Sequence, residues 1–214
     1  MWETILNKCW GASNITDNVN LLEADMKRHY KACKVENKIQ GILTPERLRA
    51  DKSYPKLKCK AAAARHLAPY ALELTKRFNN FSVHDRTKIA LCQLTVKYYD
   101  ILKSHSHFFP QDVCAELATT TNQMAVLYNS LYTEAYNNRL RLWKMTPKVH
   151  LVIHSSEAQA NMWGNPMYYW TYADEDLVGL MIEIAESCHP LTLTITALVK
   201  WLIIAFDDSS GSAA

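Results

Sequence analysis

The chain has 214 residues, of which 49% are hydrophobic and 21% are charged, and its formal net charge is +3. This balance excludes a chain that is disordered along most of its length, and the size fits one domain. Only 5 glycines are present, which argues against the many tight turns of an all-β fold. The sequence therefore predicts an all-α fold, an irregular bundle of about seven or eight helices.

We expect one helical domain over residues 1–206, followed by a disordered tail at 207–214. Within it, residues 1–145 form a helical bundle and residues 146–206 form a C-terminal part rich in His, aromatic and acidic residues. The six cysteines include no CxxC pair, so a zinc site built on close pairs is not expected. The N-terminus shows neither the basic n-region nor the apolar h-region of a secretory signal. We therefore expect an intracellular protein, nuclear or cytoplasmic, with reduced thiols.

The first part of the chain carries signals for two helices and a connector. The apolar stretch 2–10 has the pattern of a helix that Gly11 ends. Apolar residues spaced three and four apart predict a second helix over 15–39. Gly41 and Pro45 then break the helical pattern, and a polar connector follows.

A basic segment spans residues 27–65, where twelve Lys or Arg stand against three acids. Cations at this density can follow a phosphate backbone, so DNA is the partner that the segment suggests. The alternative is a solvated helix face with a polar connector, because aromatic residues are sparse there and no base-reading motif is present. The residues that we expect to contact DNA are Lys52, Lys56, Lys58, Lys60 and Arg65.

The middle of the chain predicts the centre of the bundle. Residues 60–78 return to a helical pattern, with Pro69 either kinking one helix or opening the second of two. Ser82, three residues before an Asp, predicts an N-terminal cap for the next helix. That helix is apolar around much of its circumference, so it belongs at the centre of the bundle. A turn at 108–110 then leads into a long helix that we expect to reach Trp143.

The segment 146–154, TPKVHLVIH, combines a helix start with two histidines. Thr146 is positioned to cap the helix with its hydroxyl, and Pro147 suits the first helical position. His150 and His154 stand four residues apart, so their imidazoles lie on one helical face and can share a metal ion. No Glu follows His150, so the zincin pattern is absent. The alternative is that both histidines donate to backbone or carboxylate groups while packing against aromatic residues.

After a turn at residues 164–166, an aromatic cluster precedes three consecutive acids at 174–176. We expect Trp163, Tyr169 and Trp170 to form an aromatic wall beside these acids. Such a site can bind a hard cation such as Mg²⁺, although successive helix positions let only one or two of the acids face the same ion. The alternative is that the acids open a helix, where the helix dipole favours negative charge.

The last apolar run, residues 191–206, falls short of the ~20 residues that a membrane span requires. It predicts a buried final helix and no membrane partner. No motif along the chain points to a small-molecule cofactor.

The order of TPKVHLVIH, an Asn-Pro turn and YYWTYADEDLVG resembles the C-terminal catalytic region of eukaryotic DDE (RNase H-like) transposases of the CACTA-type and related groups. In that family a helix with two histidines precedes a Gly-Pro turn and a segment with Trp, Glu-Arg and Gly. Here Asn165-Pro166 matches the turn and Trp170 matches the Trp. Glu175 matches the Glu and Gly179 the Gly. Asp176 departs from the family pattern, which has a basic residue at that place.

The resemblance is specific over residues 146–179, and the stretch 56–74 is similar to a segment of transposon-like proteins that share this C-terminal motif. It implies two-metal phosphoryl transfer, in which Glu175 supplies one catalytic carboxylate that binds Mg²⁺. The candidate metal ligands are Glu175, Asp174, His150 and His154.

The other two carboxylates of such an enzyme belong to strands of an RNase H-like sheet. No run of alternating or β-branched residues precedes the helices here. We therefore expect this chain to be the helical insertion and final helix of such a protein, separated from an N-terminal catalytic portion that carries the sheet. The chain alone is expected to show no nuclease activity, because one carboxylate binds Mg²⁺ weakly.

Three interpretations of function remain open at this point. The first is a fragment or degenerate copy of a DDE-type transposase, whose ancestral task was handling DNA. The second is a non-catalytic helical module that binds another protein through exposed aromatic side chains, since Trp and Tyr dominate interface hot spots. The third is a stand-alone metalloenzyme that uses His150, His154 and Glu175.

Overall fold

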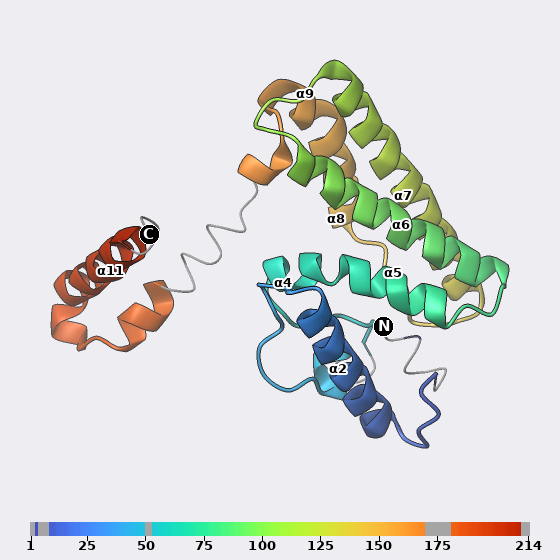
Figure 1. The fold of residues 1–214 in the computed structure, drawn as a ribbon, viewed down its shortest axis with the longest axis horizontal. Coiled ribbons are helices and arrows are strands. Elements are labelled where there is room, and N and C mark those ends of the chain that lie inside the picture. Colours follow the sequence, from blue (N-terminus) through green and yellow to red (C-terminus); the bar gives the residue numbers. More distant parts are fainter. Residues whose placement is uncertain (1–2, 4–8, 50–52, 170–180, 211–214) are drawn as a thin grey trace. The chain divides into compact units, whose positions relative to one another are not determined.

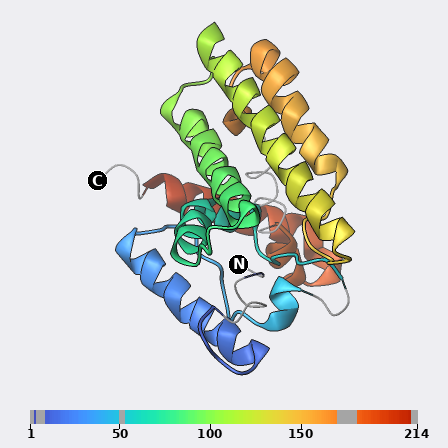
Figure 2. The same ribbon diagram turned by 90° about the vertical axis from the view of Figure 1, so that its right-hand side faces the viewer.

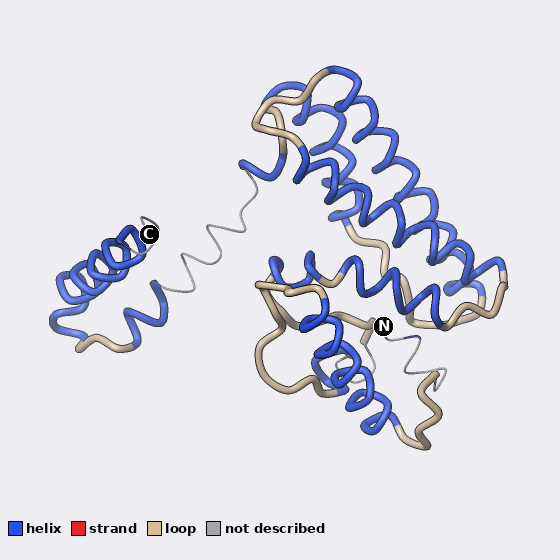
Figure 3. Tube along the Cα trace, in the orientation of Figure 1, coloured by secondary structure: helices blue, strands red, loops and turns tan. Residues whose placement is uncertain are grey.

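The computed structural model describes residues 3, 9–49, 53–169 and 181–210. These residues form helices and loops and contain no strand (Figure 3), which confirms the all-α prediction. The chain divides into two compact units, residues 1–169 and residues 170–214. A single domain over 1–206 stays a prediction.

The first helix of unit 1 with bounds in the described residues is α2 (Ile15–Ala32). Asn14 caps its N-terminus by accepting a hydrogen bond from the Asp17 amide at 2.8 Å. The helix ends earlier than the predicted residue 39. Lys34 adopts a left-handed conformation with φ of 49°, and the Val35 amide bonds back to the Tyr30 carbonyl at 3.1 Å. This closure of the last turn satisfies carbonyls that would otherwise lack donors, and it redirects the chain.

The next helices are α3 (Pro45–Leu48), α4 (Ala61–His66) and α5 (Ala68–Arg77). Residues 60–78 thus form two helices, with Pro69 in the first turn of the second, as one of the two predicted options had it. The apolar faces of α2, α4 and α5 pack into a buried cluster that also takes in residues of the connector. Its fully buried members include Val19, Leu22, Tyr70 and Leu74.

A buried polar contact fixes α5 to α2. The Tyr70 hydroxyl donates to Asp25 Oδ2 at 2.9 Å, and Arg77 donates to the same oxygen at 2.8 Å. Arg28 supplies a third donor to the other carboxylate oxygen. A buried carboxylate is stable only when its oxygens are paired in this way, so the network holds the two helices in one register.

Two long helices follow, α6 (Val83–Ser104) and α7 (Gln111–Asn137), and they form the helical hairpin that the turn at 108–110 predicted. Ser82 caps α6 by accepting from the Asp85 amide at 3.0 Å, which confirms the predicted cap. Figure 1 shows α6 between α5 and α7, at the centre of unit 1 as expected. α7 ends six residues before the predicted Trp143, because Arg139 takes φ of 54° and the Leu140 amide bonds back to Ala135.

A third long helical run packs along α7 (Figure 2). It consists of α8 (Pro147–His154), a π-helical turn η1 (Ser155–Gln159) and α9 (Ala160–Trp163). Pro147 occupies the first turn, as predicted, but the Thr146 hydroxyl makes no capping bond. That prediction was wrong, since the Thr146 backbone carbonyl accepts the bond from Val149 instead. A short 3₁₀ turn, η2 (Pro166–Tyr168), closes the described part of unit 1.

In unit 2 the described residues begin with a helical segment at 181–186, followed by η3 (Pro190–Thr192) and α11 (Leu193–Ser210). α11 reaches Ser210 and so covers part of the segment that we expected to be a disordered tail. The prediction of a buried final helix does not hold within this unit by itself, where Ile195 is 73% exposed. Among the helices that the structure describes, none combines the length and apolarity that crossing a membrane requires.

Candidate functional site

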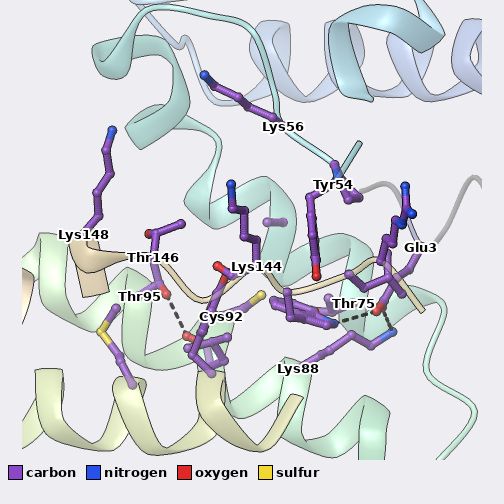
Figure 4. A pocket seen from close by; sticks show the side chains of 18 of the residues that line it. Glu3, Tyr54, Lys56, Thr75, Lys88, Cys92, Thr95, Lys144, Thr146 and Lys148 are labelled. Carbon is purple, nitrogen blue, oxygen red and sulfur yellow. Dashed lines mark hydrogen bonds and ion pairs between the residues drawn. The ribbon is translucent and has the colours of Figure 1, made fainter. Parts of the chain in front are cut away.

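A pocket of about 1070 Å³ lies in unit 1 (Figure 4), and we call it the lysine-rimmed pocket. The connector at 53–58 forms one wall, and α5, α6 and α7 form the base. The loop 141–146 contributes to the base and, with the start of α8, to the remaining wall, and Glu3 lies at one end. Widely separated segments of the chain therefore meet around one cavity, all within the unit that holds the main core.

The floor of the pocket is apolar and aromatic. Leu91 and Leu142 are buried there, and Cys92 and Met124 are half-buried beside them. The rings of Tyr128 and Trp143 meet edge to face with centroids 5.7 Å apart. The Tyr128 hydroxyl donates to the Lys144 carbonyl at 2.8 Å, which ties the loop after α7 to that helix. The Tyr54 ring also lines the cavity, with the Lys144 ammonium 5.9 Å from its centroid.

The rim is strongly cationic. Among the described lining residues, one is acidic, Glu3, and six are cationic: Lys56, Lys58, Lys88, Arg141, Lys144 and Lys148. Lys56, Lys144 and Lys148 are exposed, and their ammonium groups form no ion pair with any residue that the structure describes. Cations held on low-dielectric walls around one concavity concentrate positive potential and attract anions.

The connector that carries Lys56 and Lys58 is held in place by backbone bonds. The Lys56 amide donates to the Leu48 carbonyl at 2.7 Å, and the Lys58 amide donates to the Arg47 carbonyl at 2.8 Å. The Arg47 guanidinium in turn donates to carbonyls of the loop before α3, including Gln40 at 2.7 Å. Arg47 is one of the cations of the basic segment, and the structure uses it to brace the connector.

At one end of the pocket a half-buried charge cluster surrounds Glu3. Its Oε2 lies 2.8 Å from Lys88 Nζ, and its Oε1 accepts from the Trp143 indole at 2.8 Å. His84 Nε2 lies 3.1 Å from the same Oε1. Figure 4 shows the Glu3 carboxylate and the Lys88 ammonium side by side at the end of the pocket away from Lys148.

The pKa values follow from these contacts. Burial of the Glu3 carboxylate would by itself raise its pKa, but hydrogen bonds from His84 and Lys88 lower that pKa to about 2. The hydrogen bond to Glu3 raises the pKa of His84, against the opposing effect of burial. Burial would lower the pKa of Lys88, yet its bonds to Asp85 and Glu3 raise it. The cluster therefore favours the charged form of each of these three groups.

The predicted DNA contacts divide into three sets. Lys56 and Lys58 line the pocket, whereas Lys60 stands at the N-terminus of α4 and Arg65 lies on that helix, and neither lines it. Lys52 falls outside the described residues. Arg141, Lys144 and Lys148 also line the pocket and were not predicted, because they lie outside the basic segment 27–65. A signal for them was present, since residues 139–148 contain four cations and no acid.

The two histidines of α8 do lie on one exposed face. Their Nε2 atoms are 2.8 Å apart, and the rings meet edge to face with centroids 4.2 Å apart. In the described residues no three His, Cys, Asp or Glu side chains converge to hold a metal ion. Glu175 and Asp174 lie outside the described residues. The described part of the chain thus offers no complete Mg²⁺ site, and the metal ligands stay predictions.

The aromatic wall is described only in part. The rings of Trp163 and Tyr169 meet edge to face with centroids 6.1 Å apart. Trp163 is 55% exposed and Tyr168 is 58% exposed, so this end of unit 1 presents aromatic surface. Trp170 lies outside the described residues, and so does Gly179. Whether the wall faces the acids of 174–176 stays a prediction.

The turn at 164–166 has a structural role. Asn165 is fully buried, and its side chain donates to the Leu102 carbonyl at 2.8 Å while accepting from the Met167 amide at 3.0 Å. Its own amide donates to the His107 carbonyl at 2.6 Å. Gly164 has φ of 81°, and a Cβ there would lie 2.1 Å from that same carbonyl. The turn therefore joins the end of α9 to the end of α6.

No family model, no curated protein and no solved structure matches this chain.

Proposed function

We propose that the chain binds DNA as a single strand, or as a frayed strand end, in the lysine-rimmed pocket. The observation that carries the proposal is the composition of that pocket, with six cationic side chains and one acid around an apolar, aromatic floor. Grooves that bind single strands combine the same two features, a positive track for the backbone and aromatic rings for the bases.

A strand suits the pocket better than a duplex does. The bases of a duplex are stacked inside it, so a duplex could meet the lysines of the rim but not the floor. An unpaired strand offers phosphates to Lys56, Lys144 and Lys148 and base faces to Tyr54 and Trp143. Each base stacked on an aromatic ring contributes about 1–3 kcal/mol to binding.

The pocket also brings together the two segments that carry the family resemblance. Lys56, Lys58 and Ala71 belong to the stretch 56–74. Thr146 and Lys148 belong to the stretch 146–179. We therefore propose that the chain is a fragment or degenerate copy of a DDE-type transposase that keeps a DNA-handling part.

We do not expect the chain alone to catalyse phosphoryl transfer. The resemblance requires two further carboxylates from a sheet, and the described residues contain no strand. Bound Mg²⁺ would supply activation of water and neutralisation of the phosphate charge in a complete enzyme. We expect the purified chain to leave labelled DNA uncut when Mg²⁺ is added.

The test is the affinity for a fluorescent oligonucleotide, measured by anisotropy over a range of salt concentrations. Binding to a single strand weakens with salt, with a slope of about −0.7 in log K against log salt for each phosphate contact. Replacing Lys56, Lys144 and Lys148 together by Ala should weaken binding at low salt and reduce the magnitude of the slope by about 2.

The matched control replaces Lys31, Lys38 and Lys76 by Ala. These residues are also exposed, and the change in net charge is the same, but none of them lines the pocket. The control should keep the wild-type slope within about 0.5, because its lysines touch no phosphate in the proposed complex. Equal losses in both triple variants would point to a diffuse charge effect and would refute the pocket as the binding site.

A second candidate is protein binding through the aromatic surface at Trp163 and Tyr168. It is favoured by their exposure, since rings of this size are usually buried or engaged in an interface. Trp163→Ala separates the candidates. On the DNA proposal this variant binds oligonucleotide as the wild type does, because Trp163 lies outside the pocket.

A further inference from the structure

The Glu3 carboxylate is surrounded by N–H donors whose arrangement would also suit another anion. Three groups converge on it: the Lys88 ammonium at 2.8 Å, the Trp143 indole N–H at 2.8 Å and the His84 imidazole at 3.1 Å. We call these three side chains the anion receptor. They come from α6 and from the loop after α7, and Glu3 is the one member of the cluster that comes from the N-terminal end of the chain.

The receptor is held from behind by groups other than Glu3. His84 Nδ1 lies 2.9 Å from Glu134 Oε2, and Lys88 Nζ lies 2.6 Å from Asp85 Oδ1. The Trp143 ring packs edge to face on Tyr128. Because each donor keeps a second contact, the three N–H groups stay in place when Glu3 leaves. A receptor of this kind is preorganised for whichever anion binds there.

We propose that a phosphate of the bound strand takes the place of the Glu3 carboxylate between Lys88, His84 and Trp143, so that Glu3 competes with DNA for one position in the pocket. This inference rests on the proposed function, because it assigns one phosphate position within the same pocket. Lys88 and Glu3 both line the cavity, so the receptor opens into the space that the strand would fill.

The chemistry of exchange is balanced. A phosphodiester carries one negative charge, as the carboxylate does, so the swap leaves the net charge of the site unchanged. Asp85 and Glu134 face Lys88 and His84 from behind and offset their two positive charges. The incoming phosphate therefore meets charge-assisted donors without an excess of fixed charge. The two free oxygens of a phosphodiester match the two carboxylate oxygens in the number of acceptors offered.

Competition by Glu3 lowers the apparent affinity for DNA. If Glu3 fills the receptor for about nine-tenths of the time, removing its carboxylate raises the affinity about tenfold. The bound strand makes the same phosphate contact in the wild type and in a variant without the carboxylate, so the salt slope should stay within about 0.5 of the wild-type value. The rise in affinity has the opposite sign to the change expected when a residue contributes to binding.

The experiment compares Glu3→Ala and Glu3→Gln with the wild type, using the same fluorescent single-stranded oligonucleotide. We expect tighter binding and an unchanged salt slope in both variants. Glu3→Gln keeps the shape of the side chain and loses the charge, so it reports the effect even if Glu3→Ala perturbs the fold. Glu36→Gln is the matched control, since Glu36 is exposed and lies outside the pocket, and it should bind as the wild type does.

A third variant tests the receptor itself. Trp143→Phe keeps an aromatic ring and removes the indole N–H, so in the Glu3→Ala background it should cancel part of the gain. If the wild type binds the oligonucleotide and neither Glu3 variant binds it more tightly, the receptor proposal is overturned and DNA binding by the pocket stands. If neither the wild type nor the Glu3 variants bind it, DNA binding itself fails, and the phosphate position fails with it.

Discussion

The side-chain amide of Asn165 donates a hydrogen bond of 2.8 Å to the backbone carbonyl of Leu102, a residue 63 positions earlier in the chain. The same amide nitrogen also contacts the carbonyls of His105 and Ser106. The Leu102 and His105 carbonyls belong to the last turn and the C-cap of α6, where helix geometry leaves carbonyls without partners inside the helix, and Ser106 follows the cap. Asn165 therefore acts as a remote cap for the central helix, and the motif that carries the family resemblance has a clear part in stability.

Asn165→Ala should lower the free energy of unfolding by about 2–3 kcal/mol, because it leaves several carbonyls at a buried position without a donor. Urea denaturation followed by circular dichroism measures the change. Asn161→Ala is the control, since Asn161 lies four residues earlier and is exposed. The control should change stability by no more than about 0.5 kcal/mol. Equal effects of the two substitutions would contradict the capping role.

Gly164→Ala should destabilise unit 1 by at least about 2 kcal/mol, since strained backbone and steric overlap act together. The φ of 81° disfavours any side chain, and the new Cβ would lie 2.1 Å from the His107 carbonyl oxygen. Gly11 has nearly the same φ, 76°, and a Cβ added there would have nothing within 4 Å. Gly11→Ala should therefore lower the free energy of unfolding by only about 1 kcal/mol, the cost of a left-handed backbone conformation for a residue with a Cβ. Thermal unfolding of the two variants separates the effect of steric overlap from that of backbone strain. Equal decreases in Tm would show that the contact with His107 is unimportant.

The charge cluster around Glu3 predicts a pH dependence of stability. The pKa of Glu3 lies at about 2 in the folded protein, below its ordinary value of 4.5. A depressed pKa stabilises the fold above pH 4.5, and this contribution is lost as the pH falls from 4.5 through about 2. Glu3→Gln removes the carboxylate. The free energy of unfolding of this variant should therefore fall less over this acid range than that of the wild type. Parallel curves for the two proteins would argue against the ion pairs.

His84 should act in the opposite direction. Its pKa is raised, chiefly by the hydrogen bond to Glu3, so its charged form stabilises the fold. That contribution is complete below its ordinary pKa of 6.5 and is lost as the pH rises through the folded value. His84→Gln should therefore reduce stability at mildly acidic pH more than at alkaline pH. Proton NMR titration of the His84 ring checks the direction of the shift, and a pKa at or below 6.5 would contradict it.

Local sequence signals predicted much of the fold. Ser82 caps α6, Pro69 opens a separate helix and the turn at 108–110 makes the hairpin, because each depends on neighbours in the chain. The predicted C-terminal ends of α2 and α7 were wrong. A Lys and an Arg take the left-handed conformation at these ends, and neither residue type signals it as Gly does.

The candidate site was harder to predict, since it depends on contacts across long distances in the chain. Glu3 meets His84 across 81 positions and Trp143 across 140. No spacing rule brings such residues together, because their meeting depends on how helices pack. Lys56 and Lys58 were predicted from charge alone, and the lysines opposite them, Lys144 and Lys148, become partners only when α8 folds back along α7.

Photocrosslinking identifies the residues that a bound strand contacts. A single-stranded oligonucleotide with photoreactive bases is bound to the full chain, irradiated and digested, and the crosslinked peptides are identified by mass spectrometry. Bases that stack on the floor of the lysine-rimmed pocket should react with Tyr54, Tyr128 or Trp143. Crosslinks at Trp163, Tyr168 or Trp201, with none at the three pocket aromatics, would contradict binding in the pocket.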